Sequence, residues 1–500
     1  MLAWILLFDG RIRETVAVAA RVLDRPEPPG QALVWAATAA VPALGSLGRL
    51  GEALAVADRG LAVARADPQE LPWGETQLGL VRCLLLLGAG RLADARAIAE
   101  AGYRAAVYFD RSRRILAAEG DDTQVTMQVF QRADAMVACG VDEALSVLAL
   151  GAGDFRDAAA ADRAFAAYLA ARDAARRARS QGGDAWVEAV RAQVEAEAAF
   201  DRHWTPAVPG RLKVAALRDG DRVDAWEPVI EITGPYRLFA HLESVYLGVL
   251  ARRSLVASNV RRVVDAARGK PVLFFADRFD HWATQGGDGY AAFVGGAEGV
   301  ATDAQAAWWG ERGLGTIPHA LIATFAGDTV AAVAAFARQF PGVPLIALVD
   351  FDNDSVATSL ACARAFGERL WGVRLDTSST MVDRSLWPEM GDFNPTGVNP
   401  RLVQKVRRAL DAEGFQHVRV IVSGGFTADR IRKFEASGVP VDSYAVGSSL
   451  LKGTADYTAD VVLREGRPCA KVGRFYRPSE RLQPVELTSL SPHRDQEAPV

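Results

Sequence analysis

The 500-residue sequence predicts an α/β protein built on a seven-stranded parallel barrel, preceded by a smaller sheet-containing domain and an N-terminal helical segment. Seven short apolar runs alternate with helical segments between residues 271 and 451, a pattern typical of parallel strands buried on both faces. Seven such units in about 200 residues favour a closed or nearly closed TIM-like barrel over an open sheet.

The first 105 residues contain a repeat. "GRIRETVAVAARVL" begins at Gly10, "GRLGEALAVADRGL" at Gly48 and "GRLADARAIAEAGY" at Gly90. The periods of 38 and 42 residues suit stacked helical hairpins, so the segment resembles tetratricopeptide-like repeats. Because two and a half repeats are few for a solenoid, a plain helical bundle is an equal alternative.

Residues 106–245 predict a mixed domain. Helices are expected over 128–148 and 157–180, followed by a small antiparallel sheet over 211–236 with a turn at Asp219-Gly220. A long helix beginning near Tyr236 then leads into the barrel.

Composition excludes several classes of function. The net charge is −4 without a basic block, so no nucleic-acid surface is expected. The four cysteines show neither a CxxC motif nor zinc-ligand spacing, which indicates reduced thiols in a cytoplasmic protein. The apolar start "MLAWILLFDG" is too short for a signal peptide or a membrane span, so no membrane association is expected.

Polar residues follow each predicted barrel strand, where parallel barrels place their sites. A single group of this kind could be a salt bridge at the rim of the barrel, but seven groups at the same end of their strands predict a binding site. The groups are Asp277-Arg278, Gly295 to Glu298, Thr316 to His319, Asp350 with Asp352, Arg374 with Asp376, Ser423 to Gly425, and Gly447 to Ser449.

The last two strands end in "VSGGF" and "VGSSL", which predict a phosphate site. Glycines let the backbone approach a ligand, and successive N–H groups at a helix start attract an anion. Tight turns alone would also explain the glycines. The predicted phosphate-binding residues are Ser423, Gly424, Gly425, Gly447, Ser448 and Ser449.

From about residue 106 to 480 the chain resembles nicotinate phosphoribosyltransferases of the compact bacterial and archaeal type. The stretches that carry the resemblance include "YFDRSRRIL", "VTMQVFQR", "GTIPHALI", "GVRLDTSS", "NPTGVNPRLV" and "VSGGFTADRI". The resemblance implies an irregular seven-stranded barrel of the type II phosphoribosyltransferases over 246–455. It also implies an α/β domain over 106–245 that residues 456–490 rejoin, a flexible tail over 491–500, and a homodimer or an assembly of dimers with shared sites.

The resemblance also implies roles for single residues around the substrates. The two phosphate loops would hold the 5′-phosphate of phosphoribosyl pyrophosphate. Phe275 would stack on the pyridine ring and Arg278 would pair with the nicotinate carboxylate. Arg374 and Asp376 would lie at the sugar and the pyridine, with Asp376 a catalytic residue. Tyr108 would cover the pyridine from the partner subunit.

Two further residues complete the implied site. His319 would be phosphorylated by ATP, which couples ATP hydrolysis to nucleotide formation. An imidazole at a strand end suits phosphoryl capture, although a lone histidine beside an apolar run could equally be a core residue. Glu298 would lie near the pyridine, at a position where the family usually has an aspartate. The sequence also departs from the family's Asp-Ser-Gly, because it has Asp376-Thr377-Ser378.

The expected reaction joins nicotinate and phosphoribosyl pyrophosphate to form nicotinate mononucleotide and pyrophosphate. Mg²⁺ is the expected cofactor and ATP the expected co-substrate, and the sequence does not indicate the metal ligands. Quinolinate phosphoribosyltransferase is the alternative within the class, and its second carboxylate would need extra basic residues such as Arg252 and Arg253. A non-catalytic sensor of pyridine nucleotides, with the repeats binding a protein, is the alternative from another class.

Overall fold

The computed structural model describes residues 12–23, 97–181, 183–207 and 210–487, together with a few single residues between 32 and 59. The first repeat falls on helix α2 (Ile12–Leu23). Residues 97–100 of the third repeat are also helical. The second repeat, apart from two residues, and the predicted tail 491–500 lie outside the described residues.

The smaller domain is built on a six-stranded antiparallel sheet in the order β15-β14-β1-β7-β5-β16. Residues 211–236 form a sheet as expected, and three of the strands come from residues after the parallel sheet. The bounds are β1 Gln124–Gln131, β5 Lys213–Ala216, β7 Pro228–Pro235, β14 Tyr457–Arg464, β15 Arg467–Pro468 and β16 Gln483–Val485.

The helix expected over residues 128–148 forms only from Val141 onward, and the rest of that prediction is wrong. This stretch forms the end of β1, the short strand β2 (Met136–Val137), which pairs with β6 (Arg222–Val223), and helix α7 (Val141–Gly151). β1 lies in the middle of its sheet, and its last six residues are buried. β-Branched and aromatic side chains suit this buried strand, and Gly140, with φ +83°, turns the chain into α7.

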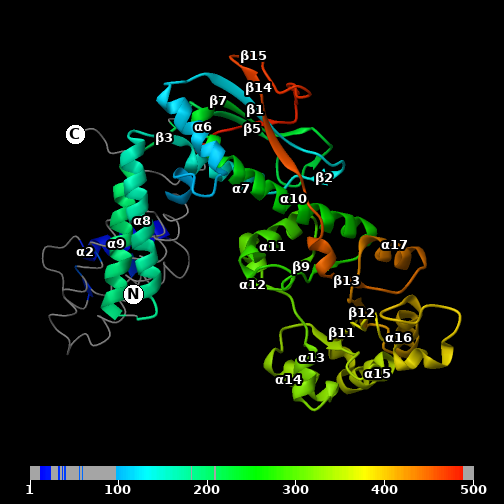
Figure 1. The fold of residues 1–500 in the computed structure, drawn as a ribbon. Helices are drawn as coiled ribbons and strands as arrows, with labels where there is room; N and C mark the ends of the chain where they lie inside the picture. Colours follow the sequence, from blue (N-terminus) through cyan, green and yellow to red (C-terminus); the bar gives the residue numbers. More distant parts are fainter. Residues whose placement is uncertain are drawn as a thin grey trace.

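A helical hairpin projects from the smaller domain, as Figure 1 shows. It consists of α8 (Ala158–Ala178) and α9 (Gly183–Asp201), which stand between the paired strands β3 (Gly153–Phe155) and β4 (Trp204–Pro206). Asp157 caps α8 by accepting the N–H of Ala160. The hairpin has a small core of its own around Tyr168 and Phe200, and Ala97 of the N-terminal segment packs into that core.

Helix α10 (Glu243–Ala266) joins the two sheets. Tyr246 and Leu250 near its start belong to the core of the smaller domain. Val256 and Val260 belong to the core of the parallel sheet. The helix begins later than Tyr236 because two 3-10 turns, Tyr236–Leu238 and Ala240–Leu242, precede it. Helix α6 (Val107–Ala118) packs on these turns.

The second core lies around a parallel six-stranded sheet in the order β10-β11-β12-β13-β8-β9. Helices follow its strands in the alternation that the sequence predicts (Figure 1). The strands are β8 Val272–Phe274, β9 Gly299–Val300, β10 Leu345–Leu348, β11 Leu370–Leu375, β12 Arg419–Val422 and β13 Ser443–Val446. The helices are α11 Gln285–Val294, α12 Asp303–Ala306, α13 His319–Thr324, α14 Thr329–Gln339, α15 Ser355–Phe366, α16 Pro400–Ala412 and α17 Ala428–Ala436.

Two of the seven predicted strands differ in the structure. The first half of the apolar run 290–299 is the end of α11, and only Gly299 of that run enters β9. The run 313–323 is extended without ladder pairing up to Pro318 and then becomes α13. Its Leu314 N–H bonds to Val300 O at 2.7 Å. Proline has no N–H to continue a ladder, and this run does not bridge the two edge strands. β9 and β10 are therefore not paired with each other, and the sheet is a curled half-barrel.

Across the described part of the chain, the helices are all too short or too polar to span a membrane.

Candidate functional site

The carboxyl ends of the parallel strands bring together most of the predicted site residues. We call this set the carboxyl-edge site. Its members come from the end of β11, from the loops after β8, β10, β11, β12 and β13, and from the start of α13. They are Phe275, Arg278, His319, Asp350, Arg374, Asp376, Ser423, Gly424, Gly425, Gly447, Ser448 and Ser449.

The loop after β12 turns at two glycines. Gly424 and Gly425 have φ values of +85° and +69°, and a Cβ on Gly424 would lie 3.3 Å from Asp376 Oδ1. Arg430 of α17 holds the loop from behind, because its Nη1 donates to the carbonyl oxygens of Gly424 at 2.7 Å and Gly425 at 3.3 Å. Burial lowers the pKa of the Arg430 guanidinium.

The loop after β13 packs closely against its neighbours. A Cβ on Gly447 would lie 3.0 Å from Phe275 O and 2.7 Å from Phe279 Cε2, so glycine lets this loop approach the end of β8. Ser449 Oγ donates to Phe426 O at 2.8 Å. The Ser449 hydroxyl therefore ties the loop after β13 to the loop after β12, and the two predicted phosphate loops are neighbours.

Asp376 is oriented by Ser423 from the next strand. Ser423 is 6% exposed, and its Oγ lies 2.8 Å from Asp376 Oδ1 and 3.2 Å from Leu375 O. Arg374, at the end of β11, has a buried Nε without a hydrogen-bond partner among the described residues. Burial lowers the pKa of Arg374, while the Asp376 and Asp350 charges oppose that shift. A buried cation with an unused donor suits an anionic ligand.

His319 is not a packed core residue. Its side chain is 44% exposed, and Nε2 lies 3.1 Å from Oδ1 of Asp350, which is 6% exposed. The Asp350 hydrogen bond and the Asp350 and Asp376 charges raise the pKa of His319, against the effects of partial burial and Arg374. Since a carboxylate only accepts, Nε2 carries the proton toward Asp350, and Nδ1 is the basic nitrogen of the neutral ring.

Two predicted residues lie away from the carboxyl-edge site. Glu298 is exposed at the amino end of β9, where its N–H bonds to Val272 O at 2.9 Å, so its predicted place at the strand ends is wrong. The error arises because residues 290–294 belong to α11, so Gly295 to Glu298 precede the strand. Tyr108 is 63% exposed on α6 in the smaller domain (Figure 1).

Three further residues belong with the site, although the sequence prediction gave them no role. Asp350 was expected at a strand end but without its function as the partner of His319. Thr377 is 2% exposed, with a hydroxyl that has no partner among the described residues. Phe279 lies against Gly447, and Arg278 Cζ is 5.9 Å from its ring centre. Their positions directly after β8, β10 and β11 were the available signal.

Arg252 and Arg253 of α10 are engaged with carboxylates. Arg252 donates to Asp288 from Nε at 2.9 Å and from Nη2 at 2.7 Å, and it also contacts Asp280 at 2.7 Å. Arg253 donates from Nε to Glu143 at 2.9 Å. These ion pairs neutralise both arginines within the chain, so they form no ready site for a second carboxylate.

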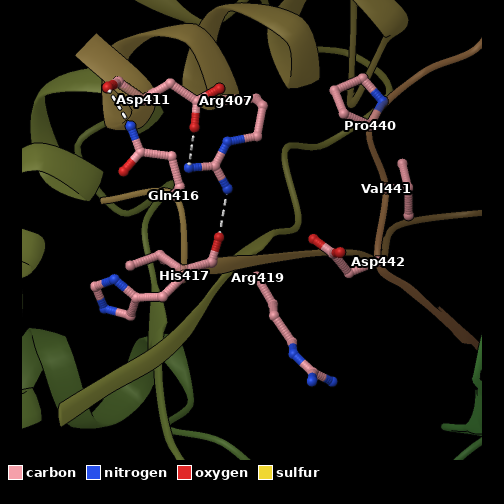
Figure 2. A pocket seen from close by; sticks show the side chains of 9 residues that line it. Arg407, Asp411, Gln416, His417, Arg419, Pro440, Val441 and Asp442 are labelled. Carbon is pink, nitrogen blue, oxygen red and sulfur yellow. Dashed lines mark hydrogen bonds and ion pairs between the residues drawn. The ribbon is translucent and has the colours of Figure 1, made fainter. Parts of the chain in front are cut away.

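A pocket of about 350 Å³ lies at the opposite edge of the parallel sheet, near the amino end of β12 (Figure 2). Arg407 pairs there with Asp411 at 2.7 Å and also bonds to Phe415 O at 2.7 Å. Asp442 accepts the Val420 N–H at 2.6 Å. Because Arg407 is already paired and the pocket lies away from the carboxyl ends of the strands, it is not the candidate site.

Sequence comparisons show which known proteins the chain is similar to. A sequence profile for the N-terminal domain of quinolinate phosphoribosyl transferase matches residues 194–254. Two nicotinate phosphoribosyltransferases of Mycobacterium tuberculosis are 28% identical over 250 residues and 29% identical over 263 residues. These matches cover 50% and 51% of this chain, and 50% and 53% of the relatives, so the chain spans about half the length of the curated relatives it matches.

A solved structure extends the likeness to most of the chain. The nicotinate-nucleotide pyrophosphorylase from Pyrococcus furiosus is 28% identical, with a TM-score of 0.57, over 76% of this chain and 79% of that chain. The half-barrel and its second domain are thus consistent with the fold of type II phosphoribosyltransferases. In sequence, the chain is similar to nicotinate phosphoribosyltransferases over about half its length, which confirms the resemblance seen in the sequence.

Proposed function

We propose that the chain transfers phosphoribose from phosphoribosyl pyrophosphate to nicotinate, which yields nicotinate mononucleotide and pyrophosphate with coupled ATP hydrolysis. The observation that carries the proposal is the carboxyl-edge site, where Arg374, Asp376 and Ser423 meet beside two glycine loops. The sugar leaves pyrophosphate as a cation-like species, and fixed charges around it stabilise that transition state. The names of the curated relatives support the same reaction.

The two glycine loops would hold the 5′-phosphate. Backbone N–H groups can approach an anion where no Cβ intervenes, and serine hydroxyls add donors. Ser449 contributes mainly by joining the loops, since its hydroxyl already donates to Phe426 O. The proposed contacts are Ser423, Gly424, Gly425, Gly447, Ser448 and Ser449.

Phe275 and Arg278 would bind nicotinate. Arg374 Cζ lies 5.9 Å from the Phe275 ring centre, so the ring-binding residue is next to the sugar-binding one. Arg278 is exposed at the mouth of the site, where its guanidinium can pair with a carboxylate. Tyr108 would reach a second site from the partner subunit of a homodimer, because its helix α6 lies beside the antiparallel sheet and away from the parallel sheet of its own chain (Figure 1).

His319 would accept the γ-phosphoryl group of ATP. Nδ1 forms the new N–P bond, the bond between the γ-phosphorus and the bridging oxygen breaks, and ADP leaves. Water later cleaves the N–P bond and releases phosphate. Asp350 stabilises the imidazole through Nε2 at 3.1 Å. A carboxylate that orients the ring in this way is the usual support for a reactive histidine.

Mg²⁺ would enter with the pyrophosphate. The described residues include no group of three His, Cys, Asp or Glu side chains that could hold a metal ion by themselves. Pyrophosphate oxygens are hard ligands that Mg²⁺ prefers, and the ion neutralises the leaving group. Arg374 and the phosphate loops then act on the rest of the substrate.

Quinolinate is the second candidate acceptor. The profile match at residues 194–254 favours it, because that profile describes the N-terminal domain of quinolinate phosphoribosyl transferase. The ion pairs of Arg252 with Asp288 and of Arg253 with Glu143 argue against it, because a second carboxylate needs uncommitted positive charge.

One product assay tests the proposal. The purified chain is offered nicotinate, nicotinamide and quinolinate in parallel, each with phosphoribosyl pyrophosphate and Mg²⁺, with and without ATP. We expect nicotinate mononucleotide only from nicotinate, and more of it with ATP. Product from quinolinate, independent of ATP, would replace the first candidate by the second. Binding of nicotinate mononucleotide without turnover of any acceptor would instead indicate a sensor.

A further inference from the structure

Two loops carry the two carboxylates of the carboxyl-edge site. Residues 349–354, between β10 and α15, include Asp350, and residues 376–399, between β11 and α16, include Asp376. β10 and β11 are neighbours in the sheet, so the loops leave the same edge side by side. The two loops are also joined directly to each other, at residues outside the site.

Asp383 makes the strongest connection between them. Its side chain is fully buried, at 0% exposure. Oδ2 accepts the N–H of Ser355 at 2.9 Å and its hydroxyl at 2.7 Å, while Oδ1 accepts the N–H of Ser385 at 3.0 Å and its hydroxyl at 2.6 Å. A buried carboxylate is stable when hydrogen bonds satisfy both oxygens. The loop after β11 thereby holds the first residue of α15.

Asn353 makes a second connection in the same place. Its φ is +55°, a conformation that asparagine tolerates better than most residues. Nδ2 donates to Val382 O at 2.7 Å, and the N–H of Arg384 donates to Asn353 O at 2.7 Å. The Asn353 N–H in turn bonds to Asp350 O at 3.1 Å. The turn that begins at Asp350 is therefore fastened to the neighbouring loop.

We propose that Asp383 is a positioning residue of the reaction, which holds the loop of Asp350 against the loop of Asp376 and so sets the place of the His319 imidazole relative to Asp376 and Arg374. Asp350 cannot shift without strain at Ser355, which two hydrogen bonds fix to a buried carboxylate. The effect on catalysis rests on the proposed function, whereas the effect on the geometry of His319 does not.

The His319 ring reports the position of Asp350 directly. The charged groups that face it are Asp350, Asp376 and Arg374, and the centre of the Phe351 ring lies 6.4 Å away. Asp350 is the main cause of the raised pKa of His319. If Asp350 moves away, that pKa falls toward its ordinary value. A residue that only stabilised the fold would change the melting temperature and leave this titration unchanged.

The test compares Asp383→Asn with Asp354→Asn. The amide at 383 places an NH₂ group where a carboxylate oxygen accepts a backbone N–H, so asparagine cannot accept from both Ser355 and Ser385. Asp354 lies in the loop that carries Asp350, and its side chain caps α15 by accepting the Ala357 N–H at 3.1 Å. The matched Asp354→Asn variant therefore changes the same chemistry without touching the connection. Ser355→Ala, which removes a single hydrogen bond to Asp383, is the milder variant.

The measurements are the His319 titration by NMR, assigned by its absence in His319→Gln, and the steady-state kinetics of the full chain. We expect Asp383→Asn to lower the pKa of His319 and to reduce kcat by about 10- to 100-fold, the loss typical of a misplaced catalytic group. Asp354→Asn should change neither. Ser355→Ala should change both in the same direction by less, and it replaces Asp383→Asn if that variant does not fold.

A folded variant with an unchanged His319 titration overturns the proposal, even if its kcat falls. Failure of the proposed function has a different signature. The wild-type chain would then form no nicotinate mononucleotide, while the titration of His319 would still respond to Asp383→Asn and not to Asp354→Asn.

Discussion

Replacing Gly425 by aspartate tests the phosphate loop with a single charge. A Cβ at this position would meet only Arg430 Nη1, at 3.8 Å, which is an ordinary contact. The backbone has φ +69°, where aspartate and asparagine are tolerated better than other side chains. We therefore expect Gly425→Asp and Gly425→Asn to fold, each with a loss of about 1 kcal/mol. The asparagine variant has the same shape without the charge.

The expected effect follows from the charges. We take a distance of about 6 Å between the 5′-phosphate and the new carboxylate. Because Gly425 is exposed, we take an effective dielectric constant of about 40. A dianion and a monoanion then repel each other by about 3 kcal/mol, which pairing of the carboxylate with Arg430 reduces to about 2 kcal/mol. The KM for phosphoribosyl pyrophosphate should therefore rise by about 30- to 150-fold.

The assay is steady-state turnover at saturating nicotinate, with the thermal midpoint measured for both variants. Gly425→Asn should raise the KM for phosphoribosyl pyrophosphate only slightly, and the KM for nicotinate should stay near the wild-type value in both variants. Equal KM values for phosphoribosyl pyrophosphate in the aspartate and asparagine variants would refute the reasoning, because the charge would then have no phosphate to repel.

Three other substitutions address the acid-binding and ATP-coupling residues. Arg278→Ala should raise the KM for nicotinate by about 10- to 50-fold through loss of a charge-assisted contact, and an equal rise for phosphoribosyl pyrophosphate would contradict that role. His319→Ala should abolish ATP hydrolysis but keep some transfer to nicotinate, whereas an unchanged ratio of ATP consumed to product formed would make it structural. Asp350→Asn should remove the stabilisation that the raised pKa of His319 provides below about pH 6.5, which is lost as the pH rises through the folded-state pKa. Urea unfolding should therefore show a larger stability difference between this variant and wild type at pH 6 than at pH 9. The difference should be at most about 1 kcal/mol, because the His319 ring is 44% exposed. A stability difference that does not depend on pH would contradict this role of Asp350.

The sequence alone determined the parts of the fold that depend on local pattern. The apolar runs at β10, β11, β12 and β13 are continuous because these strands are buried on both faces, and the structure has a strand in each. Their carboxyl ends follow directly from the chain direction, so Arg374, Asp376 and the two glycine loops could be assigned to one edge of a sheet.

Tertiary structure decided what depends on contacts between distant residues. An apolar run does not distinguish a buried strand from a buried helix, so the sequence predicted a strand where residues 290–294 belong to α11. Glu298 therefore lies at the amino edge of the sheet and not at the predicted carboxyl edge. The run at 313–323 had no partner for a full ladder because Pro318 interrupts it, and the sheet stayed open. The pairing of His319 with Asp350, the tie between Ser423 and Asp376 and the burial of Asp383 join residues on different loops. Such contacts arise only when the strand order is set, because packing and hydrogen bonding across the sheet have no local sequence signature.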